Sequence, residues 1–244
     1  MKNLEIIIPS FNEALIIERS IFEVLNFCKK NNPGCSWKII VLINGTNDNS
    51  PQIVKKLSTE NQEIVLVEHP EPGRGRALKK YWLESGADIL LYMDSDLAVD
   101  LEALPKIIKP LLLGSTDLVV GSRFNKASKL KRSLKREASS RTFNFIARFI
   151  CPHKTKDLQC GFKAINKTVF EKIAPFVESA DWFFDSELII WAETMNFRVL
   201  EIPVDWQESR LGKRPSKVNL TKIYKQFIIP LWQLRKKLKH YKAL

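Results

Sequence analysis

Short apolar runs alternate with helix-like segments through the first half of this 244-residue chain, which strongly limits the folds open to it. The runs are rich in Ile, Leu and Val and occupy residues 4–8, 38–43, 63–68, 89–93 and 117–120. Apolar side chains recur at helical spacings in the intervening residues 14–30, 51–60, 75–85 and 101–112. This alternation predicts an α/β fold with a mainly parallel central sheet flanked by helices. Strands that are apolar throughout indicate that both faces of the sheet are covered.

The second half of the chain is less regular. Residues 130–150 are amphipathic, and the side opposite the basic residues would carry Leu130, Leu134, Phe145, Ile146 and Phe149. We expect further strands at residues 162–165 and 198–204 and a helix near residues 185–195. Residues 1–217 would form one domain, and residues 218–244 a basic amphipathic C-terminal helical tail that Pro230 kinks or interrupts. The tail would either lie on a membrane or pack on the domain.

The charge is unusual for an otherwise ordinary globular composition. Hydrophobic residues make up 45% of the chain, charged residues make up 27%, and the formal net charge is +12. Lysines and arginines gather between residues 126 and 148 and again between 213 and 242. Such clusters attract nucleic acid, anionic lipid or phosphorylated substrates, and composition does not choose among them. The four cysteines lack metal-ligand spacing, so we expect free thiols. We expect neither a signal peptide nor a membrane-spanning segment of about 20 apolar residues.

Two carboxylates follow the fourth apolar run, where residues 90–96 read Leu-Leu-Tyr-Met-Asp-Ser-Asp. Open parallel sheets bind ligands at the carboxyl ends of their strands. Because side chains alternate along a strand, Asp94 and Asp96 would start on the same side. Their oxygens suit a hard divalent cation, Mg²⁺ or Mn²⁺, that leaves coordination positions for phosphate oxygens. The alternative is that Asp96 or Asp100 simply caps the following helix.

The other predicted strands also end in distinctive loops. They read Pro9-Ser10-Phe11-Asn12-Glu13, Asn44-Gly45-Thr46-Asn47-Asp48, Gly73-Arg74-Gly75-Arg76-Ala77 and Gly121-Ser122-Arg123. Phe11 could stack on a base, and Asn44 could hydrogen-bond to the edge of that base. Arg74 and Arg123 could neutralise a diphosphate. Each residue alone has an ordinary explanation as a turn, cap or surface residue, but their coincidence at successive strand ends predicts a nucleotide site.

Taken in order, these motifs resemble family 2 glycosyltransferases of the GT-A fold. The spacing Arg136-x-x-x-Ser140-x-x-x-Asn144 is similar to the acceptor-side helix of polyprenyl-phosphate sugar synthases. Two longer runs are especially similar to dolichyl-phosphate β-glucosyltransferases: Asp-Leu-Gln-Cys-Gly-Phe-Lys at residues 157–163 and Trp-Phe-Phe-Asp-Ser-Glu-Leu at residues 182–188. The resemblance extends over residues 4–217.

The resemblance implies an inverting transfer of a hexose, with glucose favoured, from a nucleotide diphosphate sugar to a polyprenyl or dolichyl phosphate. Asp94 and Asp96 would hold Mg²⁺ or Mn²⁺, Arg123 would assist at the diphosphate, and Asp185 would contact the sugar or the acceptor. The residues implied in donor binding are Pro9, Phe11, Glu13, Asn44, Arg74 and Asp94. Those implied in binding the acceptor phosphate are Arg136, Ser140, Arg210 and Lys217.

The donor and the membrane placement follow from the same resemblance. A UDP-sugar is favoured over a GDP-sugar, although Asn44 stands where relatives often have an aspartate that reads the base. Ala98 stands where mannosyl relatives often have a polar residue. The protein would be peripheral at the cytoplasmic face of a membrane, held by basic side chains and by shallow insertion of Phe145, Ile146, Phe149 and Ile150.

Two other functions are compatible with parts of this sequence. The first is a GT-A glycosyltransferase that acts on a soluble or saccharide acceptor. The second, a non-catalytic nucleic-acid-binding protein, would explain the +12 charge but not the acidic Asp94–Asp96 pair. The chain also lacks an aromatic-rich nucleic-acid motif, so no nucleic-acid partner is expected.

Overall fold

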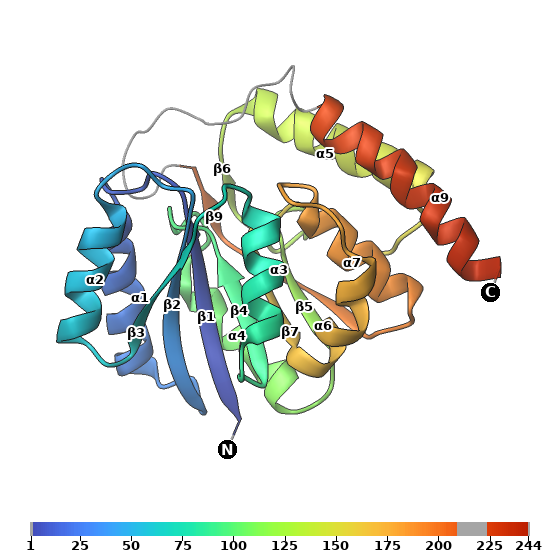
Figure 1. Ribbon diagram of the computed structural model, residues 1–244. Coiled ribbons are helices and arrows are strands. Elements are labelled where there is room, and N and C mark those ends of the chain that lie inside the picture. The colour runs from blue at the N-terminus through green and yellow to red at the C-terminus, as the bar shows by residue number, and fades with distance from the viewer. Residues whose placement is uncertain (1, 209–223, 244) are drawn as a thin grey trace.

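The computed structural model describes residues 2–208 and 224–243. Its centre is a sheet with the strand order β3-β2-β1-β4-β7-β5-β8 (Figure 1). The strands are β1 (Asn3–Ser10), β2 (Ser36–Asn44), β3 (Ile64–His69), β4 (Ile89–Met93), β5 (Leu118–Ser122), β7 (Phe162–Asn166) and β8 (Val199–Pro203). Neighbouring strands are parallel except where β7 pairs antiparallel with β4 and β5. The predicted α/β fold with a mainly parallel sheet is confirmed.

Helices cover both faces of the sheet. The helices α1 (Ile17–Asn31), α2 (Ser50–Glu60) and α4 (Leu104–Leu112) share one cluster of buried apolar side chains. A second cluster, on the other face, contains α3 (Arg74–Glu84), α6 (Lys167–Ile173) and α7 (Phe184–Thr194). Short 3₁₀ turns, η1 (Leu101–Ala103) and η2 (Ala174–Phe176), adjoin α4 and α6.

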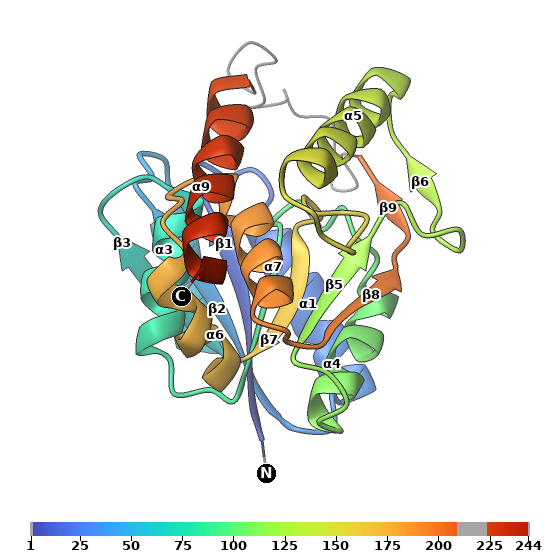
Figure 2. The same cartoon turned by 90° about the vertical axis from the view of Figure 1, so that its right-hand side faces the viewer.

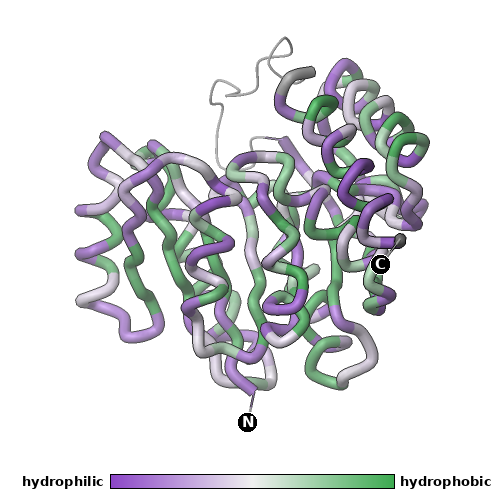
Figure 3. Tube along the Cα trace, turned by 45° about the vertical axis from the view of Figure 1, so that its right-hand side comes forward, coloured by the Kyte–Doolittle hydropathy of each residue, from purple (hydrophilic) through white to green (hydrophobic). Residues whose placement is uncertain are grey.

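The central strands supply side chains to both clusters in turn. In β1, Ile6 and Ile8 join the cluster of α1, and Ile7 joins the cluster of α3. This alternation explains why the strands are apolar at nearly every position, since each face of the sheet is buried. Figure 3 shows the strands as predominantly hydrophobic traces between helices that carry both kinds of residue.

Residues 130–150 do not form one helix. Leu130 belongs to the short strand β6 (Leu130–Lys131), which pairs with β9 (Trp206–Gln207), and helix α5 spans Leu134–Ile150. Of the five residues expected on one apolar side, Leu130 lies outside the helix and Ile146 is partly buried against the core, whereas Leu134 is exposed. Phe145 and Phe149 are 77% and 79% exposed, whereas Ile150 is 4% exposed and packs in the core. The apolar residues divide because a second helix covers one side of α5, which the sequence of α5 does not reveal.

That second helix is α9 (Ile229–Ala243), which lies beside α5 in both Figures 1 and 2. It follows the π-helical turn η3 (Tyr224–Ile228), and Pro230 lies in its first turn, where a missing N–H group is tolerated. Leu231, Leu234 and Leu238 are buried in the same cluster as α7. Residues 224–243 therefore pack on the domain, the second of the two alternatives for the tail.

The cysteines, the helices and the domain boundary can each be compared with the predictions from the sequence. The four cysteines are free thiols, and all of them are buried, as predicted. Across residues 2–208 and 224–243, no helix combines the length and the apolar character needed to span a bilayer. The expected domain boundary at residue 217 falls outside the described ranges and stays a prediction.

Candidate active site

The loops after the parallel strands meet at one edge of the sheet, the edge nearest β6 and α5 in Figure 1. Hydrogen bonds join the first loop to the second, where the backbone N–H of Asn12 donates to Thr46 Oγ1 at 3.2 Å. The N–H of Gly45 donates to the carbonyl of His69 at 3.0 Å, which ties the ends of β2 and β3 together. The convergence of these loops, predicted from strand order, is therefore present in the fold.

Asn44 links three of these loops through backbone groups. With its amide oriented to satisfy both neighbours, the nitrogen donates to the Ser10 carbonyl at 2.9 Å and the oxygen accepts from the Gly73 N–H at 3.2 Å. Asn44 is only 5% exposed. Its predicted role in base recognition stays a prediction, and its observed role is to join β1 to the start of α3.

The first-loop residues differ in accessibility. Pro9 is buried within β1, opposite Leu42 of β2, whereas Phe11 is 40% exposed at the edge. Glu13 is largely buried, and its backbone carbonyl accepts the N–H groups of Ile16 and Ile17 at the start of α1. Of this set, Phe11 is the best placed to meet a ligand that approaches the edge.

Asp94 and Asp96 lie on a tight turn directly after β4. The N–H of Leu97 donates to the Asp94 carbonyl at 3.1 Å, and Leu97 has a φ of 48°. This left-handed conformation is costly for a branched side chain and is a kind of strain that concentrates at functional sites. Asp100, not Asp96, caps η1, since its carboxylate accepts the Glu102 N–H at 3.0 Å.

The β7 strand fixes the position of Asp94. Because β7 is antiparallel to β4 and pairs Phe162 with Met93, the preceding residue Gly161 lies beside Asp94. The Asp94 N–H donates to the Gly161 carbonyl at 3.1 Å, and the Asp94 carboxylate lies against the Gly161 backbone. A side chain at residue 161 would occupy the space of that carboxylate.

Arg74 connects Asp94 with Asp185. One guanidinium nitrogen of Arg74 lies 3.0 Å from Asp94 Oδ1, and the other binds Asp185 Oδ2. The Arg74 guanidinium also stacks over the ring of Trp182, 4.2 Å from its centroid. Arg74 and Asp94, which were predicted to bind the donor, thus lie next to Asp185, which was predicted to contact the sugar or the acceptor.

Asp185 sits at the start of α7 and is 1% exposed. Its Oδ1 accepts hydrogen bonds from the Tyr92 hydroxyl and, at 2.9 Å, from the ammonium group of Lys163. Burial raises the pKa of Asp185 to about 6, with Arg74 opposing that rise. Burial also lowers the pKa of Lys163 to about 7. Sequence reasoning identified Asp185 but missed Tyr92 and Lys163 as its partners.

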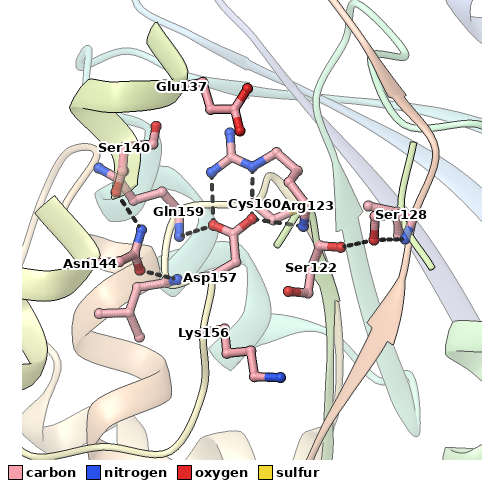
Figure 4. A network of polar contacts seen from close by, with 12 residues as sticks. Ser122, Arg123, Ser128, Glu137, Ser140, Asn144, Lys156, Asp157, Gln159 and Cys160 are labelled. Carbon is pink, nitrogen blue, oxygen red and sulfur yellow. Dashed lines mark hydrogen bonds and ion pairs between the residues drawn. The ribbon is translucent and has the colours of Figure 1, made fainter. Parts of the chain in front are cut away.

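Arg123 has a protein partner rather than an open position (Figure 4). Its Nε and Nη2 each donate to the Asp157 carboxylate at 2.7 Å, and its backbone N–H donates to the same group at 3.0 Å. Burial alone would raise the pKa of Asp157, but the charge and hydrogen bonds of Arg123 hold it below its usual value. Asp157 takes two of the five N–H donors of the Arg123 side chain, and the predicted contact of Arg123 with a phosphate stays a prediction.

The acceptor-side residues lie on α5. Arg136 pairs with the carboxylate of Glu208, and Ser140 accepts a hydrogen bond from Asn144 Nδ2 through its carbonyl at 2.8 Å. The Asn144 side chain in turn accepts the Leu158 N–H at 2.9 Å, next to Asp157 (Figure 4). Arg210 and Lys217, also predicted here, lie outside the described residues.

Glu187 lies two residues after Asp185 on α7. Its carboxylate accepts the backbone N–H groups of Glu178 and Ser179 at 2.9 and 2.8 Å, and it is 3% exposed. These bonds stabilise the segment between α6 and α7, so its observed role is structural.

The donor atoms present fit a hard divalent cation. Asp94 and Asp96 offer carboxylate oxygens, and both side chains are partly exposed at the sheet edge. Among the residues that the structure describes, no three His, Cys, Asp or Glu side chains gather as a potential metal site. A cation here would take its remaining ligands from substrate phosphates and water, as Mg²⁺ commonly does.

Comparison with known proteins identifies the family of this chain. The family described as glycosyl transferase family 2 matches residues 5–174, more than half of the chain. Glycosyltransferase AglD of Haloferax volcanii is 31% identical over 236 residues, which are 95% of this chain but 37% of that protein. A dolichyl-phosphate beta-glucosyltransferase of Trichomonas vaginalis is 30% identical over 247 residues, covering 95% of this chain and 73% of the relative. The Saccharomyces cerevisiae dolichyl-phosphate beta-glucosyltransferase is 28% identical, covering 93% and 73%.

Solved structures show the same fold. Glucosyl-3-phosphoglycerate synthase from Mycobacterium tuberculosis, solved with Mn²⁺, UDP and glucosyl-3-phosphoglycerate, has a TM-score of 0.71 at 16% identity, over 96% of this chain and 80% of that chain. The mannosyltransferase PcManGT from Pyrobaculum calidifontis, solved with GDP-Man and Mn²⁺, has a TM-score of 0.57 at 15% identity, over 98% and 74%. The resemblance inferred from the motifs is confirmed, and the chain belongs to glycosyl transferase family 2, as a glycosyltransferase with the GT-A fold.

Proposed function

We propose that this glycosyltransferase transfers a hexose, with glucose favoured, from a UDP-sugar to a polyprenyl phosphate at a membrane surface. The names of the relatives that are dolichyl-phosphate beta-glucosyltransferases support this choice. In-line displacement by the acceptor would invert the anomeric carbon.

One loop carries the proposal, because it joins the donor side of the site to a basic helix with exposed aromatic residues. At one end of the loop Leu158 is bonded to Asn144 of α5, and at the other Gly161 supports Asp94. Asp157, the residue before Leu158, binds Arg123, which directly follows β5. A phosphate held at α5 would therefore face the edge where a nucleotide diphosphate sugar would bind.

Each group of site residues would have its own role in the reaction. Asp94 and Asp96 would hold Mg²⁺ or Mn²⁺, which stabilises negative charge on a departing diphosphate when it is bound. Arg136 and Ser140 would position the acceptor phosphate, Asp185 would contact the sugar or acceptor, and Arg74 lies between the donor and acceptor sides. A phosphate monoester is already anionic, with a second pKa near ~6, so its oxygen needs positioning more than deprotonation.

The exposed side of α5 suits an anionic membrane. Leu134, Phe145 and Phe149 are 83%, 77% and 79% exposed, and the basic residues Arg141 and Arg148 lie exposed among them. Each basic group near an anionic lipid surface contributes about 1 kcal/mol, and the aromatic rings can enter the interface. Ile150, buried in the core, is no longer part of this proposed membrane contact.

Three variant proteins test the two halves of the proposal. Asp96→Ala should abolish metal-dependent turnover of the nucleotide sugar, and full turnover by this variant would contradict the assignment. For the membrane half, Phe145→Ser/Phe149→Ser and Lys131→Glu/Lys135→Glu should each lose flotation with phosphatidylserine vesicles. The matched control is Lys55→Glu/Lys56→Glu on α2, which alters exposed charges away from α5. Flotation of the Phe145→Ser/Phe149→Ser and Lys131→Glu/Lys135→Glu variants at the wild-type level would contradict docking through α5.

A further inference from the structure

Lys163 is a lysine in the core of the sheet, with an exposed fraction of 0%. It lies on β7, where it pairs with Tyr92 of β4 on one side and Val120 of β5 on the other. Lysine is almost never fully buried unless it is paired, because removing its charge from water is costly. Retaining a cation at this point of the sheet therefore calls for a specific partner.

That partner is Asp185. The Lys163 ammonium lies 2.9 Å from Asp185 Oδ1, and the Tyr92 hydroxyl donates to the same oxygen. The carbonyl of Cys160 also accepts a hydrogen bond from the Lys163 ammonium group. Lys163 and Tyr92 come from β7 and β4, two strands in the interior of the sheet, so their side chains hold the carboxylate from within the sheet.

Arg74 binds the other oxygen of Asp185 in a different way. It starts α3 at the sheet edge and binds the donor-side Asp94 at the same time. If Arg74 turns towards a donor phosphate, Asp185 loses its contact through Oδ2. The contacts through Oδ1 do not depend on the donor, because they come from within the sheet.

We propose that Lys163, together with Tyr92, is a positioning residue that keeps the Asp185 carboxylate in place while Arg74 is engaged with the donor. The inference rests on the proposed function, in which Asp185 contacts the sugar or the acceptor. A group that orients a reacting residue without touching the substrate has a large effect on the reaction rate, since a misplacement of ~1 Å can lower that rate about 10²-fold.

A double-mutant cycle tests whether Lys163 acts through Asp185. Lys163→Met, which removes the ammonium group and leaves an uncharged, unbranched side chain one atom shorter, should lower kcat about 10²-fold and change the donor KM less than about twofold. The double variant Lys163→Met/Asp185→Asn should be no slower than Asp185→Asn alone. Losses that multiply would overturn the proposal. Lys167→Met is the matched control, because Lys167 is also largely buried but bonds to the Leu83 carbonyl and Glu171.

Crystal structures separate this inference from the proposed function. In Lys163→Met crystallised with the nucleotide diphosphate sugar, the Asp185 carboxylate should turn away from Tyr92, and a carboxylate in the position that it has in the donor-bound wild type would overturn the proposal whatever the acceptor is. Failure of the wild type to transfer sugar to polyprenyl phosphate would refute only the proposed function. If Lys163→Met does not fold, Tyr92→Phe takes its place in both experiments and should show a smaller loss of kcat with the same non-additivity.

Discussion

Gly161 leaves no room for a side chain beside Asp94, and the substitution Gly161→Ala therefore tests the placement of that carboxylate. An added Cβ would lie 2.6 Å from Asp94 Oδ1 and closer still to Cγ and Oδ2, whereas ordinary contacts begin near 3.4 Å. The Asp94 side chain is 36% exposed and can turn towards solvent. We therefore expect alanine to displace the carboxylate by ~1 Å, not to unfold the protein.

A displacement of this size predicts a loss of about 10²-fold in kcat/KM, equivalent to about 2.7 kcal/mol of transition-state stabilisation. The assay is the steady-state rate of nucleotide-sugar consumption, with the affinity for UDP and Mn²⁺ measured by calorimetry. Urea unfolding should show a change of less than about 1 kcal/mol, because the substitution adds one methyl group at a site that can relax towards solvent.

Gly86→Ala is the control, because a Cβ at residue 86 meets no atom within 4 Å. It should leave both activity and metal-dependent UDP binding unchanged. A Gly161→Ala protein with wild-type kcat/KM would refute the reasoning that the Gly161 backbone sets the position of Asp94. A large fall in unfolding free energy would show that Asp94 cannot move and that the strain spreads into the sheet.

Three other predictions concern the buried ion pair, the C-terminal helix and the metal. Asp157→Asn should lower the unfolding free energy by about 3–5 kcal/mol at neutral pH, because it leaves Arg123 buried without its counter-charge. Since Arg123 lowers the pKa of Asp157, the stabilisation by this ion pair is complete above pH ~4 and is lost as the pH falls through the lowered pKa. A difference in unfolding free energy between wild type and Asp157→Asn that stays constant into acid, measured by urea unfolding, would contradict this prediction. Leu231→Ala should cost about 2–5 kcal/mol in the same assay, and a negligible loss would argue against docking of α9. EDTA should abolish donor turnover and Mg²⁺ or Mn²⁺ restore it, whereas turnover resistant to EDTA would exclude a role for the metal.

Much of the fold could be predicted because local patterns determine it. The apolar runs and helical spacings placed β1 to β5 and the helices between them, since each run had to bury two faces. The direction of β7 could not be predicted, because nothing in residues 162–166 indicates whether this strand runs parallel or antiparallel to its neighbours. The faces of α5 could not be assigned either, since they depend on α9, which follows about 80 residues later in the chain.

The same distinction holds for the site. Strand order brought Arg74 and Asp94 to one edge, as expected, because carboxyl ends of parallel strands must meet. The pairing of Arg123 with Asp157 was missed, because each residue alone resembles a group that binds ligand and their contact depends on how β7 enters the sheet.

Residues 157–163 carry the resemblance in the sequence, and the structure shows what three of them contact. Asp157 binds Arg123, Gly161 supports Asp94, and Lys163 binds Asp185. A short motif can thus hold three parts of a site in register, and the sequence reveals the motif but not the partners.

The central claim is the transfer of glucose from UDP-glucose to a polyprenyl phosphate, and mass spectrometry of the lipid product tests it most directly. Purified protein would be incubated with Mg²⁺ or Mn²⁺, a short-chain polyprenyl phosphate and each of a panel of UDP- and GDP-sugars. We predict a polyprenyl phosphate hexose formed from UDP-glucose, and a β linkage when that product is examined by NMR. Release of UDP without a lipid-linked sugar, or a product formed only from a GDP-sugar, would contradict the account.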